Sequence, residues 1–96
     1  MVKIKALDVA EFLDTPEVAV LYLTEALMSG DPAMVAKALG TIARSHGMAA
    51  VAEKSGLSRE NLYRALSGDG NPEFATVIKV LDALDISLVA QNKNAA

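Results

Sequence analysis

Residues 48–67, MAAVAEKSGLSRENLYRALS, have a spacing that predicts two short helices joined by a tight turn. Ala52 is small at the point where the second helix has to cross the first closely. Gly56, four residues later, suits a turn that needs a positive φ, which glycine adopts without steric cost. Leu57 and Leu62 are the apolar positions through which the pair buries itself. Ser58 is a favourable N-cap for the second helix.

The second of these helices carries polar side chains of the kinds that read DNA. A helix-turn-helix places its second helix in the major groove, where the first turns contact base edges. Arg59, at the start of that helix, suits a bidentate contact with guanine, the commonest specific pairing. Ser58 and the amides beside it suit a phosphate. With two flanking cations, the predicted DNA-binding residues are Ser58, Arg59, Glu60, Asn61, Tyr63, Arg64, Arg44 and Lys54.

Each of these residues also has a simpler interpretation as a solvated side chain, because exposed Arg and Lys are ordinary on any helix. The motif favours DNA for Arg59 and Arg64. Arg44 and Lys54 would add only positive charge near phosphates. Such a role does not require a particular position in the motif, so the sequence favours it no more than an ordinary solvated side chain. Glu60 would repel phosphate unless it accepts from a cytosine amino group. An ion pair with Arg64, four residues on, is its more favoured role.

The composition is that of one small globular domain with an aliphatic core. The chain has 96 residues, of which 52% are apolar and 4% aromatic, and this favours helices. It has no cysteine, and therefore no disulfide framework and no thiolate metal site. No apolar run approaches the ~18 residues of a membrane span. The start, MVKIKALDVAEF, lacks the apolar run of a signal peptide, so we expect a cytoplasmic protein.

The charges are unevenly distributed along the chain, whose formal net charge is −3. Residues 1–32 hold two lysines and six acidic residues, a net charge of −4. Residues 41–68 hold four basic and two acidic residues, a net charge of +2. The basic segment is the one with the helix-turn-helix pattern, as DNA binding would require. The acidic remainder would face away from DNA or toward a basic partner.

Start and stop signals divide the rest of the chain into helices. Thr15-Pro16-Glu17 and Asp31-Pro32 each combine a capping side chain with proline at the first helical position. Gly30 and Gly47 are the expected stops, and Asn71-Pro72 starts a last helix. The predicted helices therefore span about 16–29, 32–46, two short helices within 48–67, and 72–85, after a short helical turn at 8–13.

Two short segments have the pattern of strands. Residues 2–7, VKIKAL, alternate apolar and basic side chains, and residues 86–90, ISLVA, form a short apolar run. We expect them to pair, either within one chain or across a dimer. The expected organisation is a single helix-turn-helix domain over 1–96, with a strand and helices at 1–31, the core at 32–85, and a strand and tail at 86–96.

The helix at 16–29 has more apolar surface than one buried stripe requires. Its apolar residues, which include Leu21 and Met28, cover more than one face, whereas a surface helix of a monomer needs a single stripe. A second buried face, against another copy or another protein, would explain the excess. The alternative is that this helix simply lies across the small core.

The sequence offers no set of residues for catalysis or for a metal. His46 is the only histidine, and at the end of a helix it is better explained as a group favoured by the helix dipole. No Cys–His or Ser–His–Asp set, metalloprotease motif or P-loop is present. We therefore expect no enzymatic activity, no cofactor and no metal.

The chain resembles a known family over nearly its whole length. The part from Gly47 to Leu88, GMAAVAEKSGLSRENLYRALSGDGNPEFATVIKVLDALDISL, looks like the Cro/repressor-type helix-turn-helix domain. With FLDTPEVAVLYLTEAL and GDPAMVAKALGTIARSHGM before it, the match resembles the probable addiction-module antidote proteins, and LSRENLYRALSGDGNPEF is its most specific part. The family usually has a Ser-Gln pair after the Met, whose Gln touches phosphate. Here Ala49 and Ala50 replace that pair, which favours weaker DNA binding.

The resemblance implies an antitoxin of a type II toxin–antitoxin module that neutralises a RelE/ParE-like toxin and represses its own operon. The expected fold is an all-α, five-helix, lambda-repressor-like DNA-binding domain with short N- and C-terminal β-strands. Its expected partners are double-stranded operator DNA, the toxin and a second copy. The second copy is expected because two recognition helices related by a two-fold axis match the two half-sites of an operator. The alternative is a protein-interaction module that keeps the repressor-like fold with weak or lost DNA binding.

Overall fold

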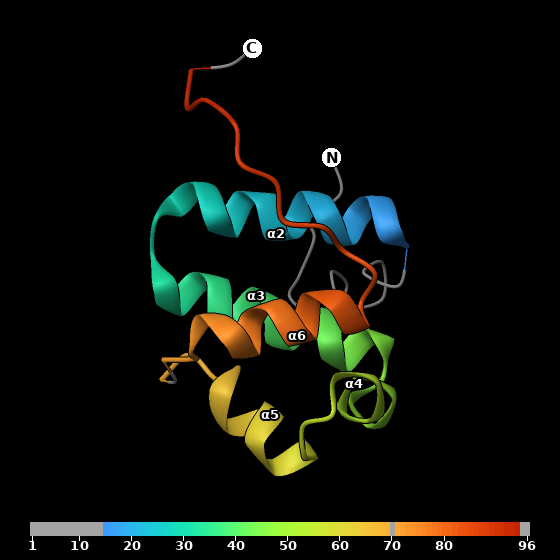
Figure 1. The fold of residues 1–96 in the computed structure, drawn as a ribbon. Coiled ribbons are helices and arrows are strands. Elements are labelled where there is room, and N and C mark those ends of the chain that lie inside the picture. Colours follow the sequence, from blue (N-terminus) through green and yellow to red (C-terminus); the bar gives the residue numbers. More distant parts are fainter. Residues whose placement is uncertain (1–14, 70, 95–96) are drawn as a thin grey trace, which may run out of the picture.

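The computed structural model describes residues 15–69 and 71–94, and within them it contains five α-helices (Figure 1). The helices are α2 (Pro16–Ser29), α3 (Pro32–His46), α4 (Met48–Ser55), α5 (Arg59–Ala65) and α6 (Phe74–Ala83). The predicted all-helical class is confirmed. α3 contacts α2, α4 and α5, and in Figure 1 α2 lies at one end of the molecule and α5 at the other.

The helices end where the chain supplies local caps. Asp31 precedes α3, and its Oδ1 accepts a hydrogen bond from the backbone N of Ala33 at 3.0 Å. Gly30 follows the last residue of α2, and Gly47 separates α3 from α4. These three boundaries agree with the sequence-based prediction, because capping depends only on residues close in the chain.

The core is aliphatic, and no polar side chain is buried among the described residues. Helices α3 to α6 all contribute to its largest fully buried side chains, which are Leu39, Ile42, Leu62, Val51 and Val80. Burying each one is worth about 1.5–3 kcal/mol relative to exposure. This core holds α4 and α5 against α3, and α6 against α4.

Gly40 lets the end of α5 approach α3 closely. A Cβ built at residue 40 would lie 2.7 Å from the carbonyl oxygen of Leu66, closer than real Cβ atoms come to a backbone oxygen. Leu66 follows α5 directly and is itself buried. The absence of a side chain at position 40 therefore allows the end of α5 to pack directly against α3.

The predicted C-terminal strand is wrong, since residues 86–90 form no strand. A strand needs a hydrogen-bonding neighbour, and a short segment in which four of five residues are apolar does not provide one. Instead, the N–H of Ile86 bonds the carbonyl of Leu81 at 2.9 Å, and Asp85 has a φ of 59°. This is the Schellman closure of α6. The predicted N-terminal strand at 2–7 and the turn at 8–13 lie outside the described residues.

The last helix begins later than predicted, at Phe74. Its N-cap is Glu73, whose ψ of 151° is extended, so Asn71 and Pro72 precede the helix. Pro72 is half-buried and lines an apolar groove. Pro72 therefore packs in the groove before α6 begins and does not occupy the first turn of that helix.

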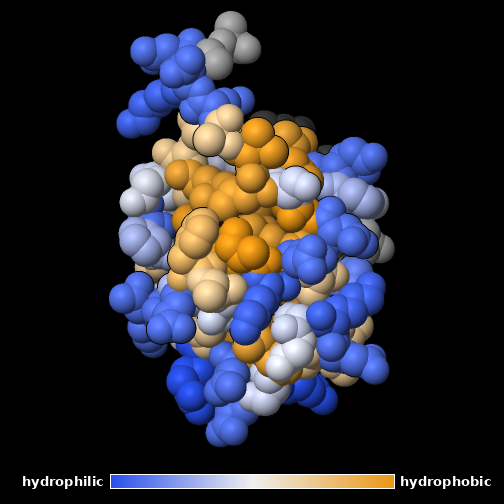
Figure 2. Space-filling view, viewed as in Figure 1, coloured by the Kyte–Doolittle hydropathy of each residue, from blue (hydrophilic) through white to orange (hydrophobic). Residues whose placement is uncertain are grey.

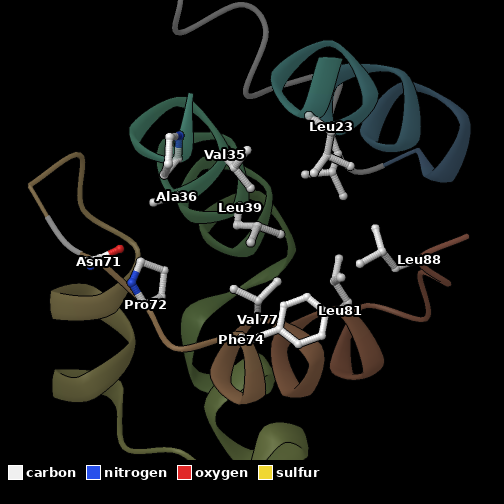
Figure 3. A pocket seen from close by; sticks show the side chains of 12 residues that line it. Leu23, Val35, Ala36, Leu39, Asn71, Pro72, Phe74, Val77, Leu81 and Leu88 are labelled. Carbon is white, nitrogen blue, oxygen red and sulfur yellow. The ribbon is translucent and has the colours of Figure 1, made fainter. Parts of the chain in front are cut away.

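An apolar groove of about 210 Å³ runs between α2, α3 and α6 (Figures 2 and 3). Leu27 of α2, Val35 of α3 and Phe74 of α6 form its walls, and Leu88 from the C-terminal segment lies beside α6. Asn71 is the one polar residue among those that line it. Within residues 15–69 and 71–94, none of the helices is long and apolar enough to span a membrane.

The predicted excess of apolar surface on α2 is confirmed. Ala19, Leu23 and Ala26 are buried. Leu21 and Met28 are 66% and 64% exposed. The helix therefore does not bury all of its apolar side chains against the core.

Candidate nucleic-acid interface

The turn between α4 and α5 is closed by backbone and side-chain hydrogen bonds within residues 52–57. Gly56 has a φ of 78°, as expected from the sequence, and its N–H bonds the carbonyl of Ala52 at 3.0 Å. The hydroxyl of Ser55 donates to the same carbonyl and accepts from the N–H of Leu57, at 3.3 Å in each case. The direction in which α5 leaves α4 is thereby fixed.

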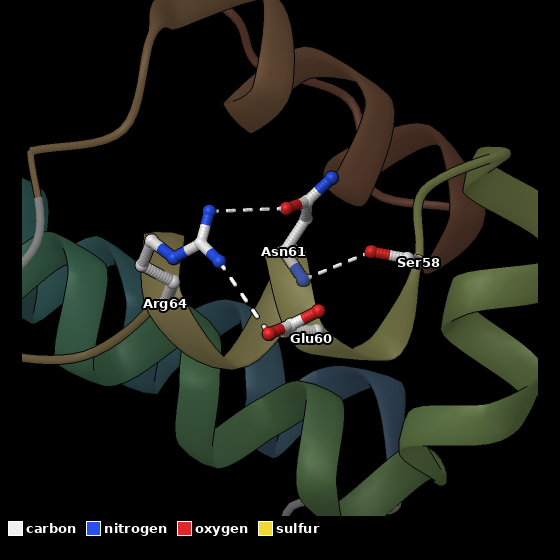
Figure 4. A network of polar contacts seen from close by, with 4 residues as sticks. All are labelled: Ser58, Glu60, Asn61 and Arg64. Atoms are coloured by element: carbon white, nitrogen blue, oxygen red, sulfur yellow. Dashed lines mark hydrogen bonds and ion pairs between the residues drawn. The ribbon is translucent and has the colours of Figure 1, made fainter.

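Ser58 caps α5, and Leu62 anchors it. The Oγ of Ser58 accepts a hydrogen bond from the backbone N of Asn61 at 3.0 Å, which satisfies a donor of the first turn (Figure 4). Leu62 is completely buried. The other predicted α5 side chains, Arg59, Glu60, Asn61, Tyr63 and Arg64, are all exposed.

Glu60 and Arg64 lie on the side of α5 that points away from the core. At about 100° per residue, each stands about 200° around the helix axis from Leu62. Arg64 Nη2 lies 3.7 Å from Glu60 Oε2, and Arg64 Nη1 donates to Asn61 Oδ1 at 3.2 Å (Figure 4). The predicted ion pair is confirmed. Its side chains are 84% and 70% exposed, so it contributes at most about 0.5 kcal/mol and can open on binding.

Arg59 and Tyr63 share one flank of α5, since they are one helical turn apart. Tyr63 is 47% exposed, and Arg59 is exposed at the first position of the helix. Asn61 lies on the opposite flank. The structure thus brings the predicted α5 residues onto one continuous polar surface, with an arginine at each end of the helix.

The two predicted flanking cations, Arg44 and Lys54, lie outside the polar surface of α5. Arg44 Nη2 donates to Thr41 Oγ1 within α3 at 3.3 Å, and its Nη1 lies beside Gly40, where the carbonyl of Leu66 approaches. A guanidinium near the end of a helix stabilises the carbonyls there. Lys54 is exposed in the last turn of α4. Neither residue joins the polar network of α5.

One feature of this region was missed in the sequence, and one was expected from it. Gly40 lies on α3, far from α5 in the sequence, and it lets the end of α5 pack closely. The signal for this close approach was a glycine inside the apolar stripe of 32–46. Ala49 is exposed in the first turn of α4. Ala49 and the half-buried Ala50 are the expected departure from the family's Ser-Gln pair, and both offer only a methyl group.

Together, the fold and this surface define a small all-helical protein that displays a short, capped, arginine-bearing helix on a rigid turn. A family model described as "Probable addiction module antidote protein" matches residues 3–92, and the chain belongs to this family. It is also 46% identical over 94 residues to an uncharacterized protein of Haemophilus influenzae (strain Rd), covering 98% of this chain and 97% of that one. No solved structure matches.

Proposed function

We propose that this chain is the DNA-binding antitoxin of a type II toxin–antitoxin module, which neutralises a RelE/ParE-like toxin and represses its own operon. In this proposal α3 to α6 form a lambda-repressor-like core in which α4 and α5 are the helix-turn-helix. The observation that carries it is the exposed polar surface of α5 on a helix fixed by Ser58, Leu62 and the Gly56 turn. The family supports the antidote role.

The geometry of α5 suggests how DNA would be read. Arg59 and Tyr63 on one flank would reach base edges and the backbone, and Arg64 would leave its ion pair with Glu60 to contact a guanine or a phosphate. Arg44 and Lys54 would add only salt-dependent attraction to phosphates. The cytoplasmic protein would act as a homodimer, because two copies of α5 would match the two half-sites of an operator.

A second candidate is a protein-interaction module that keeps the repressor-like fold with weak DNA binding. The outermost pair on α5, Glu60 and Arg64, is electrically neutral, and Ala49 offers no polar contact at the start of α4. Both observations lower the expected affinity for phosphate. In neither proposal does the chain act as an enzyme.

A gel shift with the DNA upstream of the protein's own operon tests the proposal. Replacing Arg59 or Arg64 with alanine removes an exposed side chain, so folding should be preserved while binding weakens by about 1–3 kcal/mol for each lost base contact. Lys93→Ala is the matched control, since it removes one charge from the C-terminal tail, at the other end of the molecule from α5 (Figure 1). Equal shifts for all three variants and the native chain would remove α5 as the recognition helix.

A further inference from the structure

The second apolar face of α2 points away from the rest of the molecule. At 100° per residue, Leu21 and Met28 lie on the side opposite the buried Ala19, Leu23 and Ala26. We call the face formed by Leu21, Met28 and the intervening Thr24 the outer face of α2. It has no partner among the described residues, since Leu21 and Met28 are 66% and 64% exposed.

Apolar surface continues from the outer face toward the C-terminal segment. Val20 and Leu27 of α2 are 44% and 40% exposed, and they line a shallow hollow together with Leu88 and Val89. Figure 2 shows apolar side chains gathered in this part of the molecule, whereas hydrophilic residues cover the α5 end. Adjoining exposed apolar side chains of this kind are typical of a site of protein contact.

The charged residues of α2 and of the turn that follows it are all acidic, and the next cation along the chain is Lys37 of α3, which lines another hollow with Glu25. Residues 15–36 contain no Lys, Arg or His, and their charged residues are Glu17, Glu25 and Asp31, all exposed. A second copy docked here would bring carboxylates against carboxylates, which disfavours the contact. A partner with an apolar patch bordered by Lys and Arg would complement both the apolar stripe and its acidic border.

The position of this face also favours a partner other than a second copy. α2 and α5 lie at opposite ends of the molecule, with α3 between them (Figure 1). A two-fold dimer through the outer face would direct the two α5 helices away from each other, so they could not enter neighbouring major grooves of one duplex. A different protein on α2 would leave α5 accessible.

We infer that the outer face of α2 is the docking surface for a basic protein partner, and that this partner can be bound while α5 contacts DNA. The inference rests on the proposed function, in which that partner is the toxin. The toxin would therefore be basic, would bind the outer face of α2, and would leave α5 free to contact DNA.

The test uses the protein encoded by the reading frame next to this one as the probe, titrated against the full chain. Leu21→Ser with Met28→Ser should weaken binding by about tenfold or more, as expected for two apolar contacts at the centre of an interface. Glu17→Lys with Glu25→Lys should weaken it most at low salt, because the lost attraction is screened by ions. Ile78→Ser is the matched control, as Ile78 is a 40% exposed apolar residue of α6 that lines neither the hollow beside α2 nor the apolar groove.

The titration distinguishes failure of the antitoxin function from failure of the docking surface alone. All variants should stay folded and keep the native affinity for upstream DNA, and the serine variant of α2 should melt at most a few degrees lower, because serine has a lower helix propensity than leucine or methionine. If the native chain does not bind the probe, or if the probe is acidic, both the antitoxin function and this inference are overturned. If the native chain binds but both α2 variants bind equally well, only the docking surface is wrong.

Two further results would identify another occupant of the outer face. If the isolated native chain is a dimer that the Leu21/Met28 variant converts to a monomer, a second copy covers this face, which overturns the inference. If the isolated variant melts lower by much more than the few degrees that two serines cost in a helix, the face is covered within the chain, and the inference is again wrong.

Discussion

Replacing Gly40 with alanine tests how α5 is held on α3. The new Cβ would lie 2.7 Å from the carbonyl oxygen of Leu66, 3.3 Å from Arg44 Nη1 and 3.4 Å from Leu66 Cβ. Rotation of a side chain cannot relieve the contact with a backbone oxygen, so the end of α5 has to move away. Overpacking of this kind costs about 1–3 kcal/mol. Helix propensity returns about 1 kcal/mol when a helical glycine becomes alanine. We therefore expect a net loss of about 1 kcal/mol.

Thermal unfolding followed by circular dichroism would measure this loss. For a chain of this size, 1 kcal/mol corresponds to a fall in Tm of about 4–8 °C. Gly68→Ala is the matched control, because its Cβ would meet only the flexible side chain of Lys37, with Cδ at 2.9 Å. That variant should change stability by no more than about 0.5 kcal/mol. A higher Tm for Gly40→Ala would refute the close approach of α5 to α3.

Two further substitutions probe α5 itself. Ser58→Ala removes the cap on the N–H of Asn61 and should lower stability by about 1 kcal/mol, whereas Ser58→Asp should retain most of it, as chemical denaturation would show. Glu60→Gln removes the exposed ion pair with Arg64 and should change stability by less than about 0.5 kcal/mol. It should strengthen binding to upstream DNA in fluorescence anisotropy, because a carboxylate facing phosphates is lost. Weaker binding would instead identify Glu60 as an acceptor from a base.

Local signals in the sequence predicted local structure well. The ends of α2, α3 and α4 follow from Asp31, Gly30, Gly47 and Gly56, whose capping and turn roles depend on neighbouring residues. The ion pair on α5 follows from four-residue spacing. The pattern of apolar residues on α2 indicated more apolar surface than one buried stripe needs, but it left open whether the small core would cover the excess.

Features that depend on distant parts of the chain were not predictable in the same way. The apolar run at 86–90 indicated a strand, but the need for a pairing neighbour is not visible in the run itself. The role of Gly40 requires the position of Leu66, 26 residues later. The start of α6 at Phe74 depends on how Pro72 packs into the groove between helices. The DNA-binding role of the α5 residues remains a prediction.

The two exposed surfaces have opposite chemistry and lie at opposite ends of the molecule. The α5 end carries arginines on a capped helix, and the outer face of α2 carries leucine and methionine among carboxylates. A protein built to bind one partner would need only one such surface. Their separation allows a partner at α2 to be added or removed without blocking α5.

Fluorescence anisotropy would show whether α5 reads the protein's own operator. Labelled upstream DNA and a shuffled duplex of the same composition would each be titrated with the native chain and with the Arg59→Ala/Arg64→Ala double variant, at one fixed salt concentration. We predict that the native chain binds upstream DNA at least about tenfold more tightly than the shuffled duplex, and that the double variant loses this preference. Equal affinity of the native chain for both duplexes, or an unchanged preference in the variant, would show that α5 does not read the operator.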